Sequence, residues 1–391
     1  MNIIIFEDEF FTKLYPFAYN HASFEIKTGL LSNLDRFKKA FDNANLIFVV
    51  RQEIESLVKE RFPDLNINPS VIPSGYCLNS RILWREDYNQ LYLNDYNYTN
   101  TQSLLIYNNL SDISINDFNK KIFENNRGKV NNSILVINYL WDAIDLFSDT
   151  LNRDLNNSKL DHIIKQYDSV FLINQSNIYI GDGTTIRPGS VLDAQSGPIV
   201  IGENVVVDIG SKIQGPVFID DESYISPGAL IRANCLIGEN CKIGGEVSNS
   251  IFHAFSNKAH DGFIGHSYIG EWVNIGAGTN NSNLKNNYSN IKFNFKNHIV
   301  DTQRLFLGTI IGDYTKIGIS SMLNTGTYIG FGANIFGSGF VKKFNESFSW
   351  GKNDRVDLNR FLQTCSIVKE RRDKKISSIE EKFIKDLYSE K

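Results

Sequence analysis

The stretch Ile201–Ile243, IGENVVVDIGSKIQGPVFIDDESYISPGALIRANCLIGENCKI, carries an aliphatic residue at every sixth position. Four positions after each of the first seven of these residues, the side chain is never larger than valine. A period of six fits neither a 3.6-residue helix nor an alternating strand, but it is the repeat of a hexapeptide β-helix, in which each unit forms one side of a triangular coil. The sequence therefore predicts a left-handed parallel β-helix with an inward ladder of Ile201, Val207, Ile213, Ile219, Ile225, Ile231, Ile237 and Ile243.

The same spacing resumes over Ile311–Val341, so the β-helix is expected to continue there. Two departures, at 187–200 and 279–309, interrupt the repeat. Insertions in solenoids often collect on one face and carry function, so we expect loops at these positions. Cys235 and Cys241 occupy the small inward position of the repeat, which predicts that both are inert core residues.

The sequence on either side of the repeat has a different character. Asn2–Phe6 and Leu46–Val50 read as short buried strands, with amphipathic helices between and after them, which is typical of an α/β domain. The last part of the chain reads as charged helices. We therefore predict an α/β domain with a helical linker over 1–165, the β-helix over 166–347 and a helical tail over 348–391.

Composition limits the function classes. The 391 residues include 40 Lys and Arg against 44 Asp and Glu, a net charge of −4, which argues against a protein that binds nucleic acid through a basic surface. Four cysteines without paired spacing exclude a disulfide framework and a zinc ribbon. The N-terminus lacks the basic start of a signal peptide, and no apolar run approaches the roughly 20 residues of a membrane span. We expect a cytoplasmic protein.

Four motifs carry a specific resemblance. They are GGEV at Gly244–Val247, SNKAHDGFIGHSY at Ser256–Tyr268, WVNIGAGTNNSNLKN at Trp272–Asn286 and FNESFSWG at Phe344–Gly351. This part of the chain resembles the acetyltransferase half of the bifunctional N-acetylglucosamine-1-phosphate uridylyltransferase/glucosamine-1-phosphate acetyltransferases. It is closer still to a divergent branch of that family, usually described as sugar nucleotidyltransferases. The resemblance covers the coil and tail well and the N-terminal domain more weakly, and it implies a nucleotidyltransferase-like N-terminal domain.

The resemblance implies that the β-helix transfers an acetyl group from acetyl-CoA to an amino-sugar phosphate in the synthesis of nucleotide sugars for the cell envelope. His260 would be the general base, a task that suits a group titrating near neutrality. It also implies a homotrimer with active sites between subunits. The remaining implied site residues are Arg232, Asn274, Asn283 and Lys258 for the substrate, and Ala277 and Gly337 for acetyl-CoA.

This sequence departs from the family pattern at several points. Ser248 stands near the place of a lysine that binds the sugar phosphate, and Phe263 replaces a tyrosine that contacts the substrate. The first strand is followed by Glu7 and Asp8 rather than by a glycine-rich phosphate loop, and Lys27 is the nearby cation that could meet a phosphate. Asp8 reads either as a metal ligand or as a turn residue. Nucleotidyl transfer with a nucleoside triphosphate and Mg²⁺ therefore stays open.

Two other readings belong to different classes of function. His253, His260 and His266 could hold a catalytic zinc ion, as some hexapeptide coils do, although the resemblance gives only His260 a role and implies no metal there. Alternatively, the chain could act only as a nucleotidyltransferase, or as a non-catalytic scaffold that binds a nucleotide sugar.

Overall fold

The computed structural model describes the chain except for residues 89–90, 92–96, 101–102, 125–127, 159–166, 297 and 391. The described residues form two compact units. The first unit comprises residues 1–27, 31–140 and 377–384, and the second comprises residues 28–30, 141–376 and 385–391. The predicted boundary between 165 and 166 falls on residues outside the described part of the chain, so the three-part division stays a prediction.

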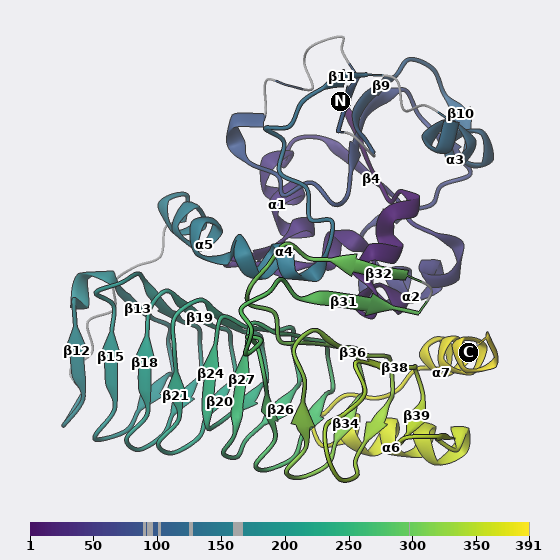
Figure 1. Ribbon diagram of the computed structural model, residues 1–391. Coiled ribbons are helices and arrows are strands. Elements are labelled where there is room, and N and C mark those ends of the chain that lie inside the picture. The colour runs from purple at the N-terminus through teal and green to yellow at the C-terminus, as the bar shows by residue number, and fades with distance from the viewer. Residues whose placement is uncertain are drawn as a thin grey trace. The chain divides into compact units, whose positions relative to one another are not determined.

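The first unit is an α/β domain around a seven-stranded sheet (Figure 1). The interior strand β1 (Asn2–Phe6) is apolar and buried from Ile3 to Phe6, as expected for a parallel strand that is covered on both faces. The strands β1, β4, β5 and β7 are parallel, whereas β9 runs antiparallel to β7. In spatial order the strands are β11 (Lys129–Val130), β8 (Tyr98–Thr99), β9 (Leu104–Asn109), β7 (Gly75–Asn79), β1 (Asn2–Phe6), β4 (Asn45–Val49) and β5 (Asn66–Ile67). The helices are α1 (Asn33–Ala40), α2 (Glu55–Arg61) and α3 (Ile115–Glu124).

The second unit contains the predicted left-handed parallel β-helix, built of three stacked sheets that we call faces 1, 2 and 3. The chain visits them in the order 1, 2, 3, 1, so each coil has a 1–2, a 2–3 and a 3–1 edge.

Face 1 consists of β12 (Phe171–Ile173), β15 (Val191–Asp193), β18 (Lys212–Gln214), β21 (Leu230–Ile231), β24 (Glu246–Ser248) and β27 (Phe263–Gly265), and the pair β30 (Asn280–Asn281) and β35 (Met322–Leu323) follows at the same position in later coils. Face 2 consists of β13 (Ile178–Ile180), β16 (Ile199–Ile201), β19 (Val217–Ile219), β22 (Cys235–Ile237), β25 (Ile251–Phe252), β28 (Tyr268–Ile269), β33 (Thr309–Ile311), β36 (Thr327–Ile329) and β38 (Phe344–Asn345). Face 3 consists of β14 (Thr185–Ile186), β17 (Val206–Val207), β20 (Tyr224–Ile225), β23 (Lys242–Ile243), β26 (Asn257–Lys258), β29 (Asn274–Ile275), β34 (Lys316–Ile317), β37 (Asn334–Ile335), β39 (Ser349–Trp350) and β40 (Asp354–Arg355).

The six-residue ladder forms the core of the β-helix. All eight aliphatic residues predicted to point inward are buried, and Ile213, Ile231 and Ile237 are completely inaccessible. Cys235 and Cys241 are buried beside them, which confirms their predicted core position, and burial raises the pKa of the Cys235 thiol to about 12. The predicted interruption at 187–200 is wrong, because this segment supplies β15 and continues the coil through a longer turn.

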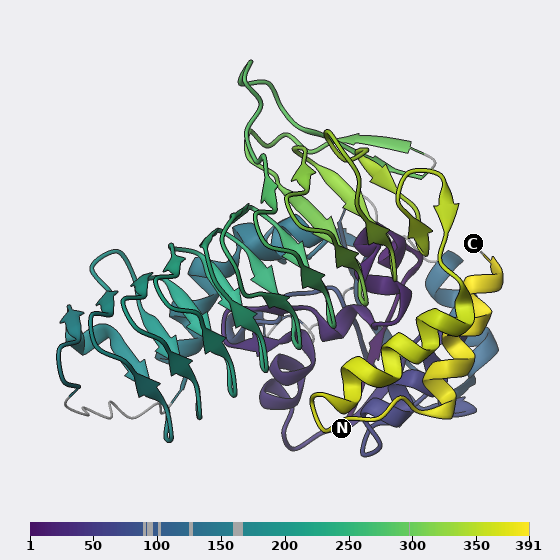
Figure 2. The ribbon, with the colours of Figure 1, turned by 90° about the horizontal axis from the view of Figure 1, so that it is seen from below.

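The second predicted interruption is a true insertion. It contains an antiparallel hairpin of β31 (Lys292–Phe295) and β32 (His298–Asp301), which leaves the coils between β30 and β33 (Figure 2). Phe293 packs edge-on against Trp141 of α4 (Leu140–Asp145), and Arg304 forms ion pairs with Asp142 and Asp145 of that helix.

The chain ends in helices, as the sequence predicts. α6 (Leu358–Glu370) follows the last coil and buries Phe361 and Cys365, and α7 (Ser378–Glu390) follows α6. A further helix, α5 (Phe147–Asn156), precedes the β-helix. Among the described residues, no helix is both long and apolar enough to cross a bilayer.

Candidate functional site

The proposed base His260 is exposed in a turn at the 3–1 edge of the β-helix, between β26 and β27. The next coil places Ala277 at the same edge, and the amide of Gly278 donates a hydrogen bond to the carbonyl oxygen of Asp261, which joins the two turns. Gly337 follows β37 at the same edge in a later coil. The structure therefore gathers the expected base and the two expected acetyl-CoA positions along one edge.

Lys258 lies inside the β-helix, in register with Ile243 of the preceding coil. Its side chain is 1% exposed, and its amine donates to the carbonyl oxygens of Gly244, at 3.0 Å, and of His260, at 2.7 Å. Burial lowers the pKa of this amine to about 8. The inward amine thus holds the His260 turn from within the β-helix, whereas the family resemblance implied that Lys258 contacts the substrate.

Face 1 begins at this edge and carries the cation expected to hold a sugar phosphate. Arg232 lies at the far end of the face and pairs with Glu246, 3.1 Å between Nη1 and Oε1. Phe263 stands outward in the same row as Glu246, one strand further along. A Cβ built on Gly265 would lie 2.5 Å from the Phe263 ring, so the ring covers this glycine. Near His260, the outer side of face 1 thus carries the Arg232–Glu246 pair and the Phe263 ring.

Asn283 lies at the 1–2 edge and interacts with His266, to which the family resemblance gave no role. Its Nδ2 is 2.9 Å from Nδ1 of His266, whose ring stacks on Phe306 at 5.0 Å between centroids. Burial lowers the pKa of His266 to about 4, so its imidazole is neutral near pH 7. The sequence signal for His266 was weak, because its partners come from the following coil and from the inserted segment.

Asn274 is exposed on the outer side of face 3, next to Asn257 and Lys316 in the neighbouring strands. Asn274 therefore lies on a different face of the β-helix from Arg232, which is on face 1. One chain brings His260 together with Ala277 and Gly337, but it places the two expected sugar contacts Asn274 and Arg232 on different faces.

The three histidines considered for zinc lie at three different edges of the β-helix. His253 is at the 2–3 edge, where its Nδ1 is 2.9 Å from a carboxylate oxygen of Glu271, whereas His260 is at the 3–1 edge and His266 at the 1–2 edge. Zinc needs its ligand nitrogens at about 2.1 Å from one ion. These histidines of a single chain do not meet that requirement.

In the first unit, Asp8 follows β1 and is fully engaged within the protein. Arg81, which is inaccessible to solvent, donates to both carboxylate oxygens, at 2.9 and 2.6 Å, and Asn79 donates to one of them at 2.8 Å. Glu7 is likewise bound by the Arg51 guanidinium, at 2.9 Å to each oxygen. These contacts hold the Asp8 carboxylate in a buried ion pair with Arg81.

A cavity of about 310 Å³ opens where β1 and β4 end. In parallel α/β sheets, ligands bind outside the carboxyl ends of the strands, so this is the expected position of a nucleotide. Lys27, the expected phosphate partner, is not among the residues that line it. Its polar lining includes Glu7, Asp8, Glu9, Arg51, Gln52, Glu55, Asn68, Asn116 and Asn119.

Comparisons with known proteins agree with this two-part architecture. Residues 3–162 match a family model described as sugar nucleotidyl transferase. Over 149 residues, which are 38% of this chain and 37% of the relative, the chain is 34% identical to the bifunctional sugar-1-phosphate nucleotidylyltransferase/acetyltransferase of Sulfurisphaera tokodaii.

Two further relatives are bifunctional GlmU proteins. The one from Thermodesulfovibrio yellowstonii is 30% identical over 187 residues, 43% of this chain and 38% of that protein. The one from Wigglesworthia glossinidia brevipalpis is 24% identical over 338 residues, 82% of this chain and 68% of that protein. The matched part spans well under half the length of the first two relatives. Over the matched parts, the chain is thus similar to bifunctional sugar-1-phosphate nucleotidylyltransferase/acetyltransferases, at 24–34% identity.

Proposed function

We propose that the β-helix transfers the acetyl group of acetyl-CoA to the amine of an amino-sugar phosphate, with His260 as general base. The observation that carries this proposal is the 3–1 edge, where the exposed His260 stands one coil from Ala277. Ala277 and Gly337 are the small positions against which the extended thioester arm is expected to lie, and the exposed Ile319 stands in the coil between them.

In this reaction the amine nitrogen attacks the thioester carbonyl carbon. A C–N bond forms, the C–S bond breaks, and the sulfur leaves as the CoA thiol. His260 accepts the proton that the amine loses and returns a proton to the departing thiolate. The turn must hold the imidazole in place for this exchange, which the internal hydrogen bond from Lys258 to the His260 carbonyl supports.

The sugar phosphate is expected on the outer side of face 1. Arg232 supplies the cation for the phosphate, and the Phe263 ring offers an apolar surface for one side of the sugar ring. Ser248, near the place of the family's second phosphate-binding lysine, leaves fewer cations for the phosphate. Glucosamine-1-phosphate is the leading substrate candidate.

We also infer that a complete site contains two copies of the chain and that the assembly is a homotrimer. The outer faces of a triangular coil point away from one another, so Asn274 on face 3 and Arg232 on face 1 contact one substrate only if they come from two different copies that meet at this site. Three such contacts close a ring. Exposed apolar side chains on the last coils would be covered by this contact, namely Ile319, Met322, Phe336 and Phe340.

The match to the sugar nucleotidyl transferase model favours a second activity in the first unit. The cavity beyond β1 and β4 has the position of a nucleotide site. Glu7 and Asp8 do not fit a magnesium site, because Arg51, Arg81 and Asn79 already occupy their oxygens. We therefore assign no step to Mg²⁺ and treat nucleotidyl transfer as the alternative function. Acetyl-CoA and nucleoside triphosphates are both compounds of the cytoplasm, so we place both proposed reactions there. Their products would supply sugars for the cell envelope.

The deciding experiment is a panel of amino-sugar phosphates with acetyl-CoA, followed by the release of free thiol. We expect turnover with at least one sugar, and a loss on the order of 10²–10⁴ in kcat for His260→Ala. His298→Ala is the matched control, since His298 is exposed in the same unit. Equal rates for His260→Ala and wild type would overturn the mechanism. Pyrophosphate release from a nucleoside triphosphate and a sugar phosphate, without acetyl transfer, would favour nucleotidyl transfer by the first unit as the function. Binding of nucleotide sugars without either reaction would favour a scaffold.

A further inference from the structure

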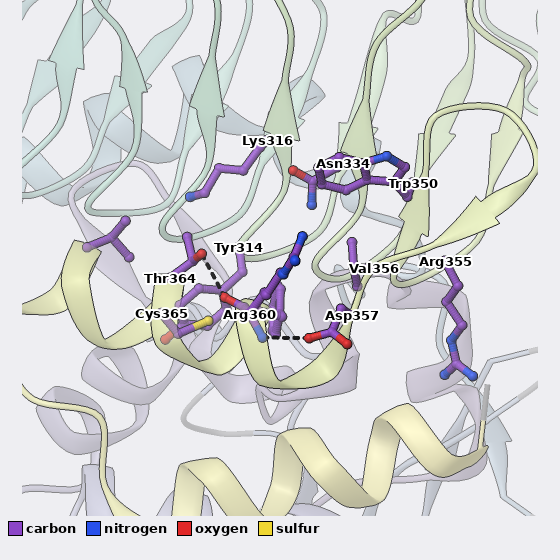
Figure 3. Close-up of a pocket in the computed structure, with 12 residues that line it drawn as sticks. Tyr314, Lys316, Asn334, Trp350, Arg355, Val356, Asp357, Arg360, Thr364 and Cys365 are labelled. Carbon is purple, nitrogen blue, oxygen red and sulfur yellow. Dashed lines mark hydrogen bonds between the residues drawn. The ribbon is translucent and has the colours of Figure 1, made fainter.

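A second cavity of about 460 Å³ lies between face 3 and helix α6, away from the 3–1 edge (Figure 3). Its walls are largely apolar: Tyr314, Val356 and Phe361 are buried, and Trp350 stands at the rim with 47% of its surface exposed. All lining residues belong to the second unit. Neither the proposed acetyl transfer nor nucleotidyl transfer uses any of them.

The charged groups in this cavity are mostly cations. Lys316 and Asn334 reach down from face 3, and the Arg360 side chain reaches up from α6, whereas the Arg355 guanidinium is turned away and stacks 3.6 Å from the centroid of the Tyr388 ring. The one acidic residue in the lining, Asp357, accepts a hydrogen bond from the backbone amide of Arg360 at the start of α6.

The two inward cations lack an acidic partner within the described residues. The Lys316 amine donates to the carbonyl oxygen of Trp272, at 2.7 Å, and burial lowers its pKa to about 8. The Arg360 guanidinium forms no ion pair in the described part of the chain. Asp357 also lines the cavity, but among the described residues its carboxylate pairs with neither cation, so Lys316 and Arg360 create a favourable environment for an added anion.

We propose that this cavity is a binding site for a small organic anion, whose phosphate or carboxylate lies between Lys316 and Arg360 and whose apolar body packs against Tyr314, Phe361 and Val368. Asn334 offers a neutral hydrogen-bond donor to the same oxyanion. Because α6 forms one wall, an occupied site would hold this helix against the last coils. The inference does not rest on the acetyltransferase proposal.

The test is isothermal titration of the full chain with phenyl phosphate and, separately, with benzoate. These probes distinguish a phosphate from a carboxylate on the same aromatic body, while inorganic phosphate and benzyl alcohol test each half alone. We expect saturable binding of at least one aromatic anion and a Kd at least about tenfold higher for either half alone. The Trp350 fluorescence should change with the same midpoint, and Trp350→Phe should remove that change while binding is retained.

Variants locate the site. Arg360→Gln and Lys316→Met should each weaken binding of the aromatic anion by about tenfold or more, since each removes a charged hydrogen-bond donor. Arg371→Gln removes an equal charge from an exposed residue just after α6 and should leave the Kd unchanged. Arg232→Gln should also leave it unchanged, which separates this site from the sugar-phosphate surface of face 1.

Two results would overturn the proposal. One is the absence of saturable binding of both aromatic anions at millimolar concentration. The other is binding that Arg360→Gln leaves unaffected while far-ultraviolet circular dichroism shows a folded protein. Arg360 is exposed, so this variant stays informative even if Lys316→Met fails to fold.

Discussion

The amine of Lys258 donates a hydrogen bond, 2.7 Å long, to the backbone carbonyl oxygen of His260 from inside the β-helix. A lysine at an inward ladder position replaces the aliphatic residue that the coil carries one turn earlier, at Ile243. A buried ammonium is costly unless its hydrogen bonds are made, and here two carbonyl oxygens accept them. The protein therefore keeps a destabilising residue in its core where that residue can hold the turn of the proposed base.

Replacing Lys258 by methionine tests this relationship. Methionine fills the same space without a charge, so we expect the midpoint of thermal unfolding to stay equal or to rise. The His260 turn would lose its internal partner, and we expect kcat for acetyl transfer to fall by on the order of tenfold to 10²-fold. Lys242→Met is the control, because Lys242 is exposed on the adjacent strand of the same face. A variant that is fully active would show that the internal hydrogen bond does not position the base.

The sequence predicted the β-helix well but did not predict the inward position of Lys258, for one physical reason. The inward aliphatic residue recurs every six residues, so many positions independently support the same periodicity. A chance run of aliphatic residues would not match it at all of them. After Ile243 the coils shorten. On face 3 the inward residues Ile225 and Ile243 are 243 − 225 = 18 residues apart, whereas the next two steps on this face are 258 − 243 = 15 and 275 − 258 = 17 residues. A strict six-residue period no longer predicts which residues point inward in these coils. Lys258 was therefore expected at the surface, as a substrate ligand.

The side-chain contacts in the two candidate sites join residues that are far apart in the sequence, so no local sequence pattern predicts them. His266 and Asn283 are 17 residues apart, and the insertion brings Phe306 onto the His266 ring. In the first unit, Asp8 meets Arg81 across 73 positions of sequence. Sequence reasoning could name Asp8 as a turn residue or a metal ligand, but only the three-dimensional contact decides between them.

The buried His266 predicts a dependence of stability on pH. Its pKa is lowered to about 4 in the folded chain, against about 6.5 for an ordinary histidine. Between these values the unfolded chain binds more protons than the folded one, so the free energy of unfolding rises with pH across this window. Urea denaturation near pH 4 and near pH 7 should show a smaller difference for His266→Gln than for wild type. The exposed His298→Gln serves as control and should keep the wild-type difference.

Breaking the buried Asp8–Arg81 pair should destabilise the first unit. Arg81→Met leaves the Asp8 carboxylate buried without its cation, and we expect a loss of about 3–5 kcal/mol in the free energy of unfolding. If Asp8 were instead a metal ligand, adding Mg²⁺ would raise the unfolding midpoint of the wild type through this residue. We expect that Asp8→Asn leaves any effect of Mg²⁺ on the midpoint unchanged.

The positions of Asn274 and Arg232 on different faces predict that two inactive variants restore activity when they are combined. Asn274→Ala and Arg232→Ala should each lower acetyl transfer, because each removes one substrate contact. When the two variants are unfolded together and refolded as a mixture, random trimers give each site an intact Asn274 from one copy and an intact Arg232 from its neighbour about once in four. We expect about a quarter of the wild-type rate per site, measured by thiol release, with light scattering to report the trimer. Mixing Asn274→Ala with His260→Ala provides a second measurement, which tells whether the base and Asn274 belong to the same copy. If the first mixture is no more active than its components, the sugar site is contained in a single chain and the shared-site proposal is wrong.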